Sequence, residues 1–202
     1  MDSTATIVKS IQSSARDLGL EIPSDERAAY VIGLSLDEAL QKVFPDLEAK
    51  AYPRLIERYR YHYLANDHEL PLFHGVREML DELTQSGYFL AVATGKSRVG
   101  LNRALHAADL LSTFDATRCS DETFSKPHPA MLLELTKELG QDMKRTLMIG
   151  DTTHDLQMAM NAGAESIAVE YGAHDKEALH AMSPLFSAKN VPELHRWLSE
   201  NA

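Results

Sequence analysis

A turn that carries two carboxylates constrains this chain more than any other feature. Gly150 and Asp151 follow a short apolar run at residues 146–149, and Asp155 lies one helical turn further on. A strand that ends in Gly-Asp and continues into a helix places its acids at the carboxyl edge of a sheet, where open α/β folds bind ligands. Two acids there suit a hard divalent cation such as Mg²⁺, which prefers oxygen ligands. The alternative is a simple helix cap, with Asp151 satisfying free amides and Asp155 merely exposed.

The pattern around this turn changes at about residue 71. Residues 3–70 carry apolar stripes at helical spacing. Beyond residue 71, helical stretches alternate with short runs that are typical of strands. We expect strands at 88–93, 114–119, 146–149 and 166–169, and helices at 75–86, 98–107, 129–139 and 155–162. Such alternation predicts an α/β fold with a mostly parallel sheet and right-handed crossovers. The strand at 88–93 is apolar throughout, which predicts burial on both faces.

Composition narrows the class of protein. The 202 residues suffice for one α/β domain with a small insertion. The net charge of −10 argues against a nucleic-acid surface, and no apolar run is long enough to suggest a membrane span. Cys119 is the single cysteine, which fits a reducing cytosol and predicts a cytoplasmic protein. We interpret Cys119 as a small buried apolar residue.

Two further features follow the expected strands. Thr94 and Gly95 come directly after the strand at 88–93, where a hydroxyl and the amides of the next helix can bind an anion. The alternative is a plain turn with a helix cap. Lys126 is followed by Pro127 and Pro129 just before an expected helix, and a lysine fixed by two prolines suits phosphate neutralisation. The alternative there is an exposed lysine at a proline-marked helix start.

The order of these features, Thr94, then Lys126, then Asp151 with Asp155, resembles the haloacid dehalogenase (HAD) superfamily. The resemblance covers nearly the whole chain and is strongest to the phosphoglycolate phosphatase and β-phosphoglucomutase branch. It implies a Rossmann-like α/β core made of residues 1–3 and 71–202, with a helical cap domain at residues 4–70. It also implies a Mg²⁺-dependent phosphatase that hydrolyses a small phosphorylated metabolite, like phosphoglycolate, through an aspartyl-phosphate.

The same resemblance implies a role for each site residue. Thr94, with Gly95, would hold a phosphoryl oxygen, and Lys126 would neutralise charge on the nucleophile and on the phosphate. Asp151 would bind Mg²⁺ directly or through water, while Asp155 would support the metal shell and Lys126. His154 is interpreted as a variable, exposed position with no catalytic role.

The first motif of the superfamily, Asp-x-Asp-Gly-Thr-Leu-x-Asp-Ser, does not occur in full at the start of this sequence. That motif supplies the nucleophile and the general acid and base, and only Asp2 and Ser3 resemble its last residues. We therefore interpret Met1 as an internal residue or the chain as truncated, and we expect the chain as given to hold no nucleophile and to be inactive. A phosphomutase of the same branch and a non-catalytic binding protein remain alternatives.

The first motif also follows the central strand of the superfamily's sheet, whose order is 5-4-1-2-3. Without that strand, the strand at 146–149 is separated from the one at 88–93, which leaves unpaired backbone on both sides of a gap. We expect the gap to be closed by strand rearrangement, by a segment swapped from another subunit, or by aggregation. Self-association is thus an expected property of this chain.

Overall fold

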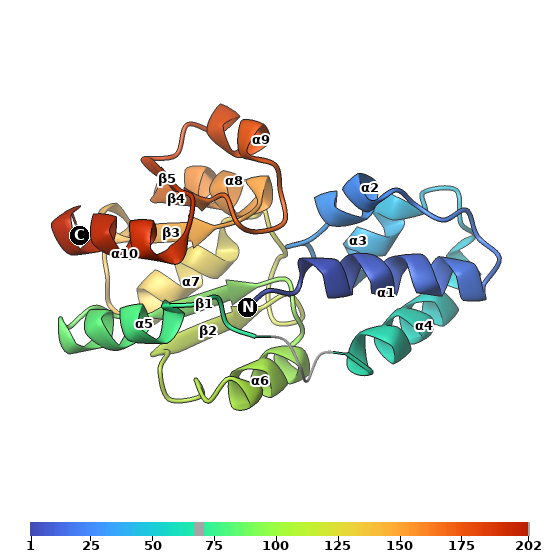
Figure 1. The fold of residues 1–202 in the computed structure, drawn as a ribbon, viewed down its shortest axis with the longest axis horizontal. Coiled ribbons are helices and arrows are strands. Elements are labelled where there is room, and N and C mark those ends of the chain that lie inside the picture. The colour runs from blue at the N-terminus through green and yellow to red at the C-terminus, as the bar shows by residue number, and fades with distance from the viewer. Residues whose placement is uncertain (67–70, 202) are drawn as a thin grey trace.

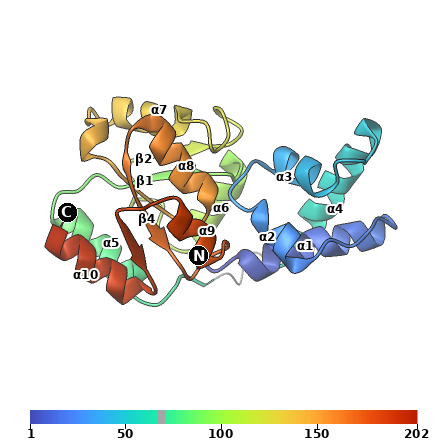
Figure 2. The same cartoon turned by 90° about the horizontal axis from the view of Figure 1, so that it is seen from above.

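A computed structural model of the chain describes residues 1–66 and 71–201. Figure 1 shows a helical part next to an α/β part, and Figure 2 shows the same arrangement from above. The helical part contains α1 (Thr4–Asp17), α2 (Asp25–Tyr30), α3 (Leu36–Val43), the 3-10 turn η1 (Ala49–Ala51) and α4 (Tyr52–Leu64). Residues 67–70 of the expected helical region lie outside the described residues.

Apolar stripes explain how the helical part holds together. Ile11, Leu40 and Leu55 come from three different helices and are completely buried in one cluster. Serine side chains set two of the helix starts, because Ser24 accepts a hydrogen bond from the Arg27 amide and Ser35 accepts one from the Glu38 amide. The helical part therefore has a core of its own.

The α/β part alternates strands and helices as expected. Its strands are β1 (Ala91–Thr94), β2 (Ala116–Cys119), β3 (Leu147–Gly150), β4 (Glu165–Val169) and β5 (Phe186–Ala188). Its helices are α5 (Val76–Gln85), α6 (Arg98–Ala107), α7 (Ala130–Glu138), the 3-10 turn η3 (Met143–Arg145), α8 (Thr153–Ala162), α9 (Lys176–Ala181) and α10 (Val191–Asn201). Every strand pair is parallel, with Thr94 opposite Cys119 and Gly150 opposite Ala168. None of the described helices is long and apolar enough to cross a membrane.

The strands form two separate sheets. One has the order β1-β2 and the other β3-β4-β5, so β1 and β3 share no ladder in the described part of the chain. The expected separation of these two strands is confirmed. Helix α7 connects the halves by packing, since Met131 and Leu132 lie in one cluster with Met148 of β3 and Ala93 of β1. No described strand has moved between β1 and β3, so rearrangement is not found, while swapping and aggregation stay predictions.

The predicted strand at 88–93 was wrong at its start. Tyr88 and Phe89 are 42% and 55% exposed, and β1 begins only at Ala91. The Leu90 amide donates to the Asp115 carboxylate at 2.8 Å rather than to a backbone carbonyl, while the Leu90 carbonyl still accepts from the Asp115 amide at 2.8 Å. Burial of β1 is also incomplete, because Ala91 is exposed and residues 92–94 are only half-buried. The predicted burial of Cys119 is confirmed.

Candidate active site

The acidic turn forms where β3 passes into α8. Thr152 is the N-cap of α8, and its amide donates to Asp155 Oδ2 at 3.1 Å while its hydroxyl accepts from the Asp155 amide at 3.3 Å. A side chain at Gly150 would place its Cβ 2.2 Å from Asp155 Cβ, so this close approach requires glycine. Asp155 is only 3% exposed, which rules out the interpretation of an exposed helix residue.

Lys126 is buried against this turn. Its Nζ lies 2.5 Å from Asp155 Oδ1, and Lys126 itself is 6% exposed. Burial alone would raise the pKa of Asp155. The Lys126 ammonium and the hydrogen bonds from Thr152 outweigh that effect and hold the pKa of this carboxyl below its usual value. Both carboxylate oxygens of Asp155 are therefore engaged, one with Lys126 and one with Thr152.

Asp151 is held differently. Its Oδ2 accepts a hydrogen bond from the Ala173 amide at 2.9 Å, and its carbonyl accepts one from the His174 amide at 3.1 Å. Burial, followed by the negative charge of Asp155, raises the pKa of Asp151. Its other carboxylate oxygen receives no hydrogen bond from another described residue. Asp151 is thus a buried carboxylate whose charged form is disfavoured, and one of its oxygens accepts from no other described residue.

The described residues do not by themselves form a complete metal site. They contain no group of three or more His, Cys, Asp or Glu side chains arranged to hold a metal ion. Mg²⁺ commonly binds through one or two carboxylates together with waters and substrate phosphate, so a single acid fits one position of such a shell. Asp151 suits that position, whereas the oxygens of Asp155 are already occupied by hydrogen-bond donors.

Thr94 and Gly95 form the turn at the carboxyl end of β1. The Thr94 hydroxyl accepts from the Lys96 amide at 3.1 Å, and the Gly95 carbonyl accepts from Ser120 Oγ at 2.8 Å. A Cβ at Gly95 would lie 2.3 Å from the Leu34 carbonyl oxygen. The backbone of the helical part at Leu34 therefore packs directly against the backbone of this turn. Because its oxygen serves as acceptor, the Thr94 hydroxyl keeps its proton to donate to an anion.

The loop between α2 and α3 contacts all three sequence features. A Cβ at Gly95 would lie 2.5 Å from the Gly33 carbonyl oxygen, and one at Gly33 would lie 3.0 Å from Thr152 Oγ1. The Ser35 amide donates to Ser125 Oγ, next to Lys126, at 3.0 Å. Thr94, Lys126 and Asp151 are thus grouped around one loop, residues 33–35. Sequence reasoning missed this loop. The only residue that could have indicated it is Gly33, which adopts a φ of +97°.

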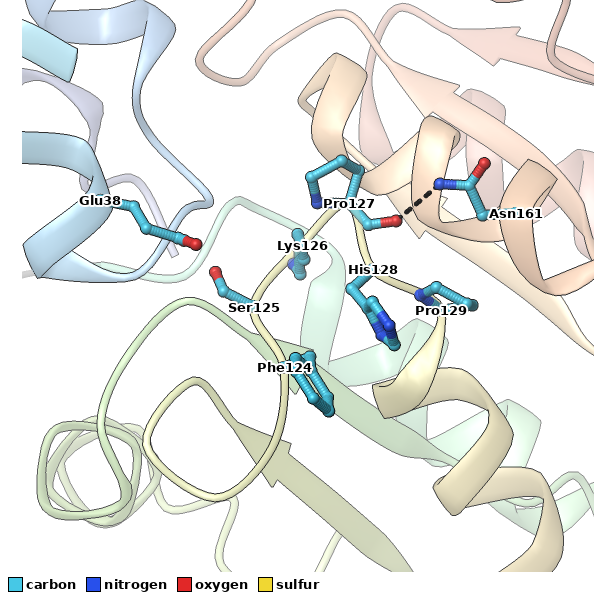
Figure 3. A pocket seen from close by; sticks show the side chains of 8 residues that line it. All are labelled: Glu38, Phe124, Ser125, Lys126, Pro127, His128, Pro129 and Asn161. Atoms are coloured by element: carbon cyan, nitrogen blue, oxygen red, sulfur yellow. Dashed lines mark hydrogen bonds between the residues drawn. The ribbon is translucent and has the colours of Figure 1, made fainter.

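An open pocket lies beside the Lys126 loop. It has a volume of about 430 Å³ and lies between α3 and the start of α7. Figure 3 shows Glu38 reaching from the helical part toward Ser125, with Phe124 and His128 on the other side of the loop. The lining residues are Glu38, Phe124, Ser125, Lys126, Pro127, His128, Pro129 and Asn161.

Sequence reasoning also misplaced His154. His154 was expected to be exposed, but it is buried, with only 8% of its surface accessible. Its Nε2 lies 2.9 Å from the Tyr30 carbonyl oxygen. His174, which attracted no attention in the sequence, reaches the same carbonyl at 3.0 Å. The two histidines lie 124 and 144 positions from Tyr30, so local periodicity gives no sign of the contact.

Known proteins are similar to this chain in sequence and in fold. The profile of the haloacid dehalogenase-like hydrolases matches residues 1–169. The probable phosphatase IndB of Dickeya dadantii is 35% identical over 191 residues, which cover 91% of this chain and 82% of that protein. A phosphoglycolate phosphatase of Agrobacterium fabrum is 29% identical over 87% of this chain and 78% of its own length.

Solved structures agree on the fold. A hydrolase from Pseudomonas syringae superposes with a TM-score of 0.90 at 22% identity, covering 100% of this chain and 94% of that one. A predicted phosphoglycolate phosphatase from Haemophilus somnus gives a TM-score of 0.86 at 22% identity, covering 98% and 91%. With a family profile that spans most of its length, this chain belongs to the haloacid dehalogenase-like hydrolases.

Proposed function

We propose that this chain is the substrate-binding body of a Mg²⁺-dependent phosphatase that hydrolyses a small phosphorylated metabolite of the phosphoglycolate kind. The observation that carries the proposal is the buried Lys126, fixed by Asp155 beside Asp151. In a chain of net charge −10, a buried lysine held in a fixed position offers an anionic ligand a local positive charge. The phosphatase relatives support the same reaction class.

Each group has a chemical task in this proposal. The Lys126 ammonium has three donors, of which Asp155 Oδ1 takes one, so donors remain for phosphoryl oxygens. The Thr94 hydroxyl and nearby backbone amides donate to another phosphoryl oxygen. Asp151 holds Mg²⁺, which when bound offsets the charge of the phosphate and of the carboxylates around it.

The helical part acts as the cap in this proposal. Its loop at residues 33–35 lies against the turns of Thr94, Lys126 and Asp151, which is where a lid must lie to exclude water from the reaction. The pocket between Glu38 and the Lys126 loop offers space next to the phosphate for part of the substrate. Substrate choice would then depend on the cap side of that pocket.

The proposal assigns the nucleophile to none of the site residues described above. An attacking group must stand in line with the leaving oxygen, and Asp155 is engaged by Lys126 and Thr152 while Asp151 is reserved for the cation. Activity therefore requires the family's first motif as well, so the 202-residue chain alone is expected to be inactive. The strand preceding that motif would fit between β1 and β3, which share no ladder among the described residues. Without it, chains would associate at the same place.

The test uses a version extended before Met1 by a strand and an Asp-x-Asp-Gly-Thr segment, hereafter the extended chain. Phosphate release from phosphoglycolate and p-nitrophenyl phosphate is measured with Mg²⁺ and with a chelator. We expect Mg²⁺-dependent turnover that falls by about 10²–10³-fold in Lys126→Met, because a charged donor to the transition state is lost. Lys137→Met, an exposed lysine on α7, is the matched control and should leave turnover unchanged.

Other outcomes point elsewhere. Unaltered turnover in Lys126→Met contradicts the assigned role of that residue. Transfer of phosphate between sugar positions, without release, favours a phosphomutase. Mg²⁺-dependent binding of phosphate esters with no turnover in the extended chain favours a binding protein.

A further inference from the structure

Two histidines of the α/β part converge on a single carbonyl of the helical part. His154 lies in the first turn of α8 and His174 in the segment after β4, and both are buried. Their Nε2 atoms lie 2.9 and 3.0 Å from the Tyr30 carbonyl oxygen. A carbonyl only accepts hydrogen bonds, so both rings donate from Nε2. Tyr30 is the last residue of α2, where helix carbonyls lack partners within the helix.

The aromatic ring of Tyr30 strengthens the same contact. It stacks on His174 with ring centroids 5.3 Å apart and planes inclined by 8°, and it meets His154 edge-on at 5.6 Å. Tyr30 therefore uses its backbone oxygen and its side chain on the same two imidazoles. We call this three-residue contact the histidine clasp.

His174 also contacts the acidic turn through its other atoms. Its Nδ1 accepts from the Thr153 amide at 3.1 Å, so one ring nitrogen is fixed as an acceptor and the other as a donor. Its own amide donates to the Asp151 carbonyl at 3.1 Å, and the amide just before it, of Ala173, donates to Asp151 Oδ2 at 2.9 Å. The segment that orients the Asp151 carboxylate is thus the segment that holds Tyr30.

We propose that His174 is a positioning residue that couples the seating of the cap to the orientation of Asp151. This inference rests on the proposed function only in the role it gives to Asp151. With α2 seated, the clasp holds residues 173–174 against Asp151 and aims its free oxygen. When α2 withdraws, His174 loses its acceptor, the segment relaxes and Asp151 loses its Ala173 hydrogen bond. The acid is then oriented for its ligand only while the cap is closed.

Hydrogen exchange on the 202-residue chain separates coupling from two independent contacts. His154→Ala removes half of the clasp and breaks no hydrogen bond of Ala173 or of the His174 amide, although it also removes the edge-on contact between the His154 and His174 rings, whose centroids lie 5.2 Å apart. Coupling predicts about tenfold faster exchange in residues 28–34, and exchange at least threefold faster at the amides of Ala173 and His174 as well. Faster exchange in residues 28–34 with residues 173–174 unchanged would overturn the proposal. His180→Ala on α9, a histidine paired with Glu170, is the matched control and should leave exchange in both segments unchanged.

Two conservative variants of His174 guard against simple loss of folding. In His174→Gln the amide nitrogen reaches the Nε2 position and keeps the bond to Tyr30, whereas in His174→Asn the amide oxygen occupies the Nδ1 position and keeps only the bond to Thr153. We expect Gln to preserve protection of residues 28–34 and Asn to lose it. Equal protection in both variants would also overturn the proposal.

Activity gives an independent readout in the extended chain. His174→Asn should raise the Mg²⁺ concentration for half-maximal rate by about tenfold and leave the rate at saturating Mg²⁺ within about twofold, since the acid is misaimed rather than removed. A change in saturating rate alone contradicts the positioning role. If the extended chain has no activity at all, the proposed function fails, while the exchange experiment still decides the coupling.

Discussion

The buried ion pair between Lys126 and Asp155 makes a quantitative prediction. The two groups lie 2.5 Å apart with 6% and 3% of their residue surfaces exposed, so neither charge can turn to water. Removing one member leaves the other charge uncompensated in the interior, which costs about 3–5 kcal/mol. Lys126→Met and Asp155→Asn should each destabilise by about that amount, corresponding to roughly 2–4 °C in Tm per kcal/mol for a chain of this size.

The double variant should be far less destabilised than the sum of the two. With both charges gone, neither position 126 nor position 155 holds an unpaired ion, and the asparagine introduced at position 155 can still accept from the Thr152 amide through its side-chain oxygen. We expect a loss of about 1–2 kcal/mol in the double variant, and hence a coupling energy of at least about 3 kcal/mol. Lys137→Met should stay within about 0.5 kcal/mol of the parent, because that lysine is exposed.

Urea unfolding at one fixed protein concentration measures these differences. Circular dichroism reports the helices, and the fluorescence of Trp197, which stacks on Phe186 at 5.6 Å, reports the three-stranded sheet. Single effects that add to within about 0.5 kcal/mol in the double variant would show that the two groups do not interact energetically. That result would refute the reasoning that Lys126 is fixed by Asp155.

Further predictions concern the acids, the cap and the gap. Burial raises the pKa of Asp151, so Asp151→Asn should stabilise the chain at neutral pH, and it should abolish activity of the extended chain by removing the proposed Mg²⁺ ligand. Urea unfolding at several pH values should show that the gain in stability vanishes as pH falls and the wild-type acid takes a proton. Asp155 has a lowered pKa, so its contribution is present above the unfolded value near 3.8 and is lost as pH falls further; acid titration of the unfolding free energy should show a smaller decline in Asp155→Asn. Gly95→Ala should speed hydrogen exchange in residues 31–35 by about tenfold, because its Cβ would lie 2.3 Å from the Leu34 carbonyl oxygen; unchanged exchange contradicts that contact. Sedimentation velocity should show concentration-dependent association of the 202-residue chain and a monomer for the extended chain, whereas equal behaviour of both contradicts association at the strand gap.

The sequence predicted the order of the elements because their signals are local. The apolar stripes and helix-capping residues at 3–66, and the alternation of helices and strands after residue 71, depend on neighbours within one turn or one strand. The separation of β1 from β3 was also expected, and it followed from the resemblance rather than from periodicity. Strand β5 and helix α9 were missed because they have three and six residues and carry little pattern of their own.

From the sequence we proposed the acids and the lysine of the candidate site, but not the residues that surround them. Asp151, Asp155 and Lys126 stand in recognisable spacing, so residue type and order sufficed to propose them as site residues, and the structure brings Lys126 and Asp155 into contact. The histidine clasp joins Tyr30 to residues more than a hundred positions away, and only the folded chain reveals such a contact. His154 was misjudged for this reason, since its position suggested an exposed face of a helix that α2 in fact covers.

Phosphate release by the 202-residue chain beside the extended chain tests the central claim most directly. Both are assayed with Mg²⁺ on phosphoglycolate and p-nitrophenyl phosphate, with Lys126→Met in each as a check for contaminating activity. The account predicts turnover in the extended chain alone, lost on removal of Mg²⁺ or of the Lys126 charge. Turnover in the 202-residue chain that depends on Lys126 would contradict it, because a nucleophile would then lie among the residues to which none has been assigned.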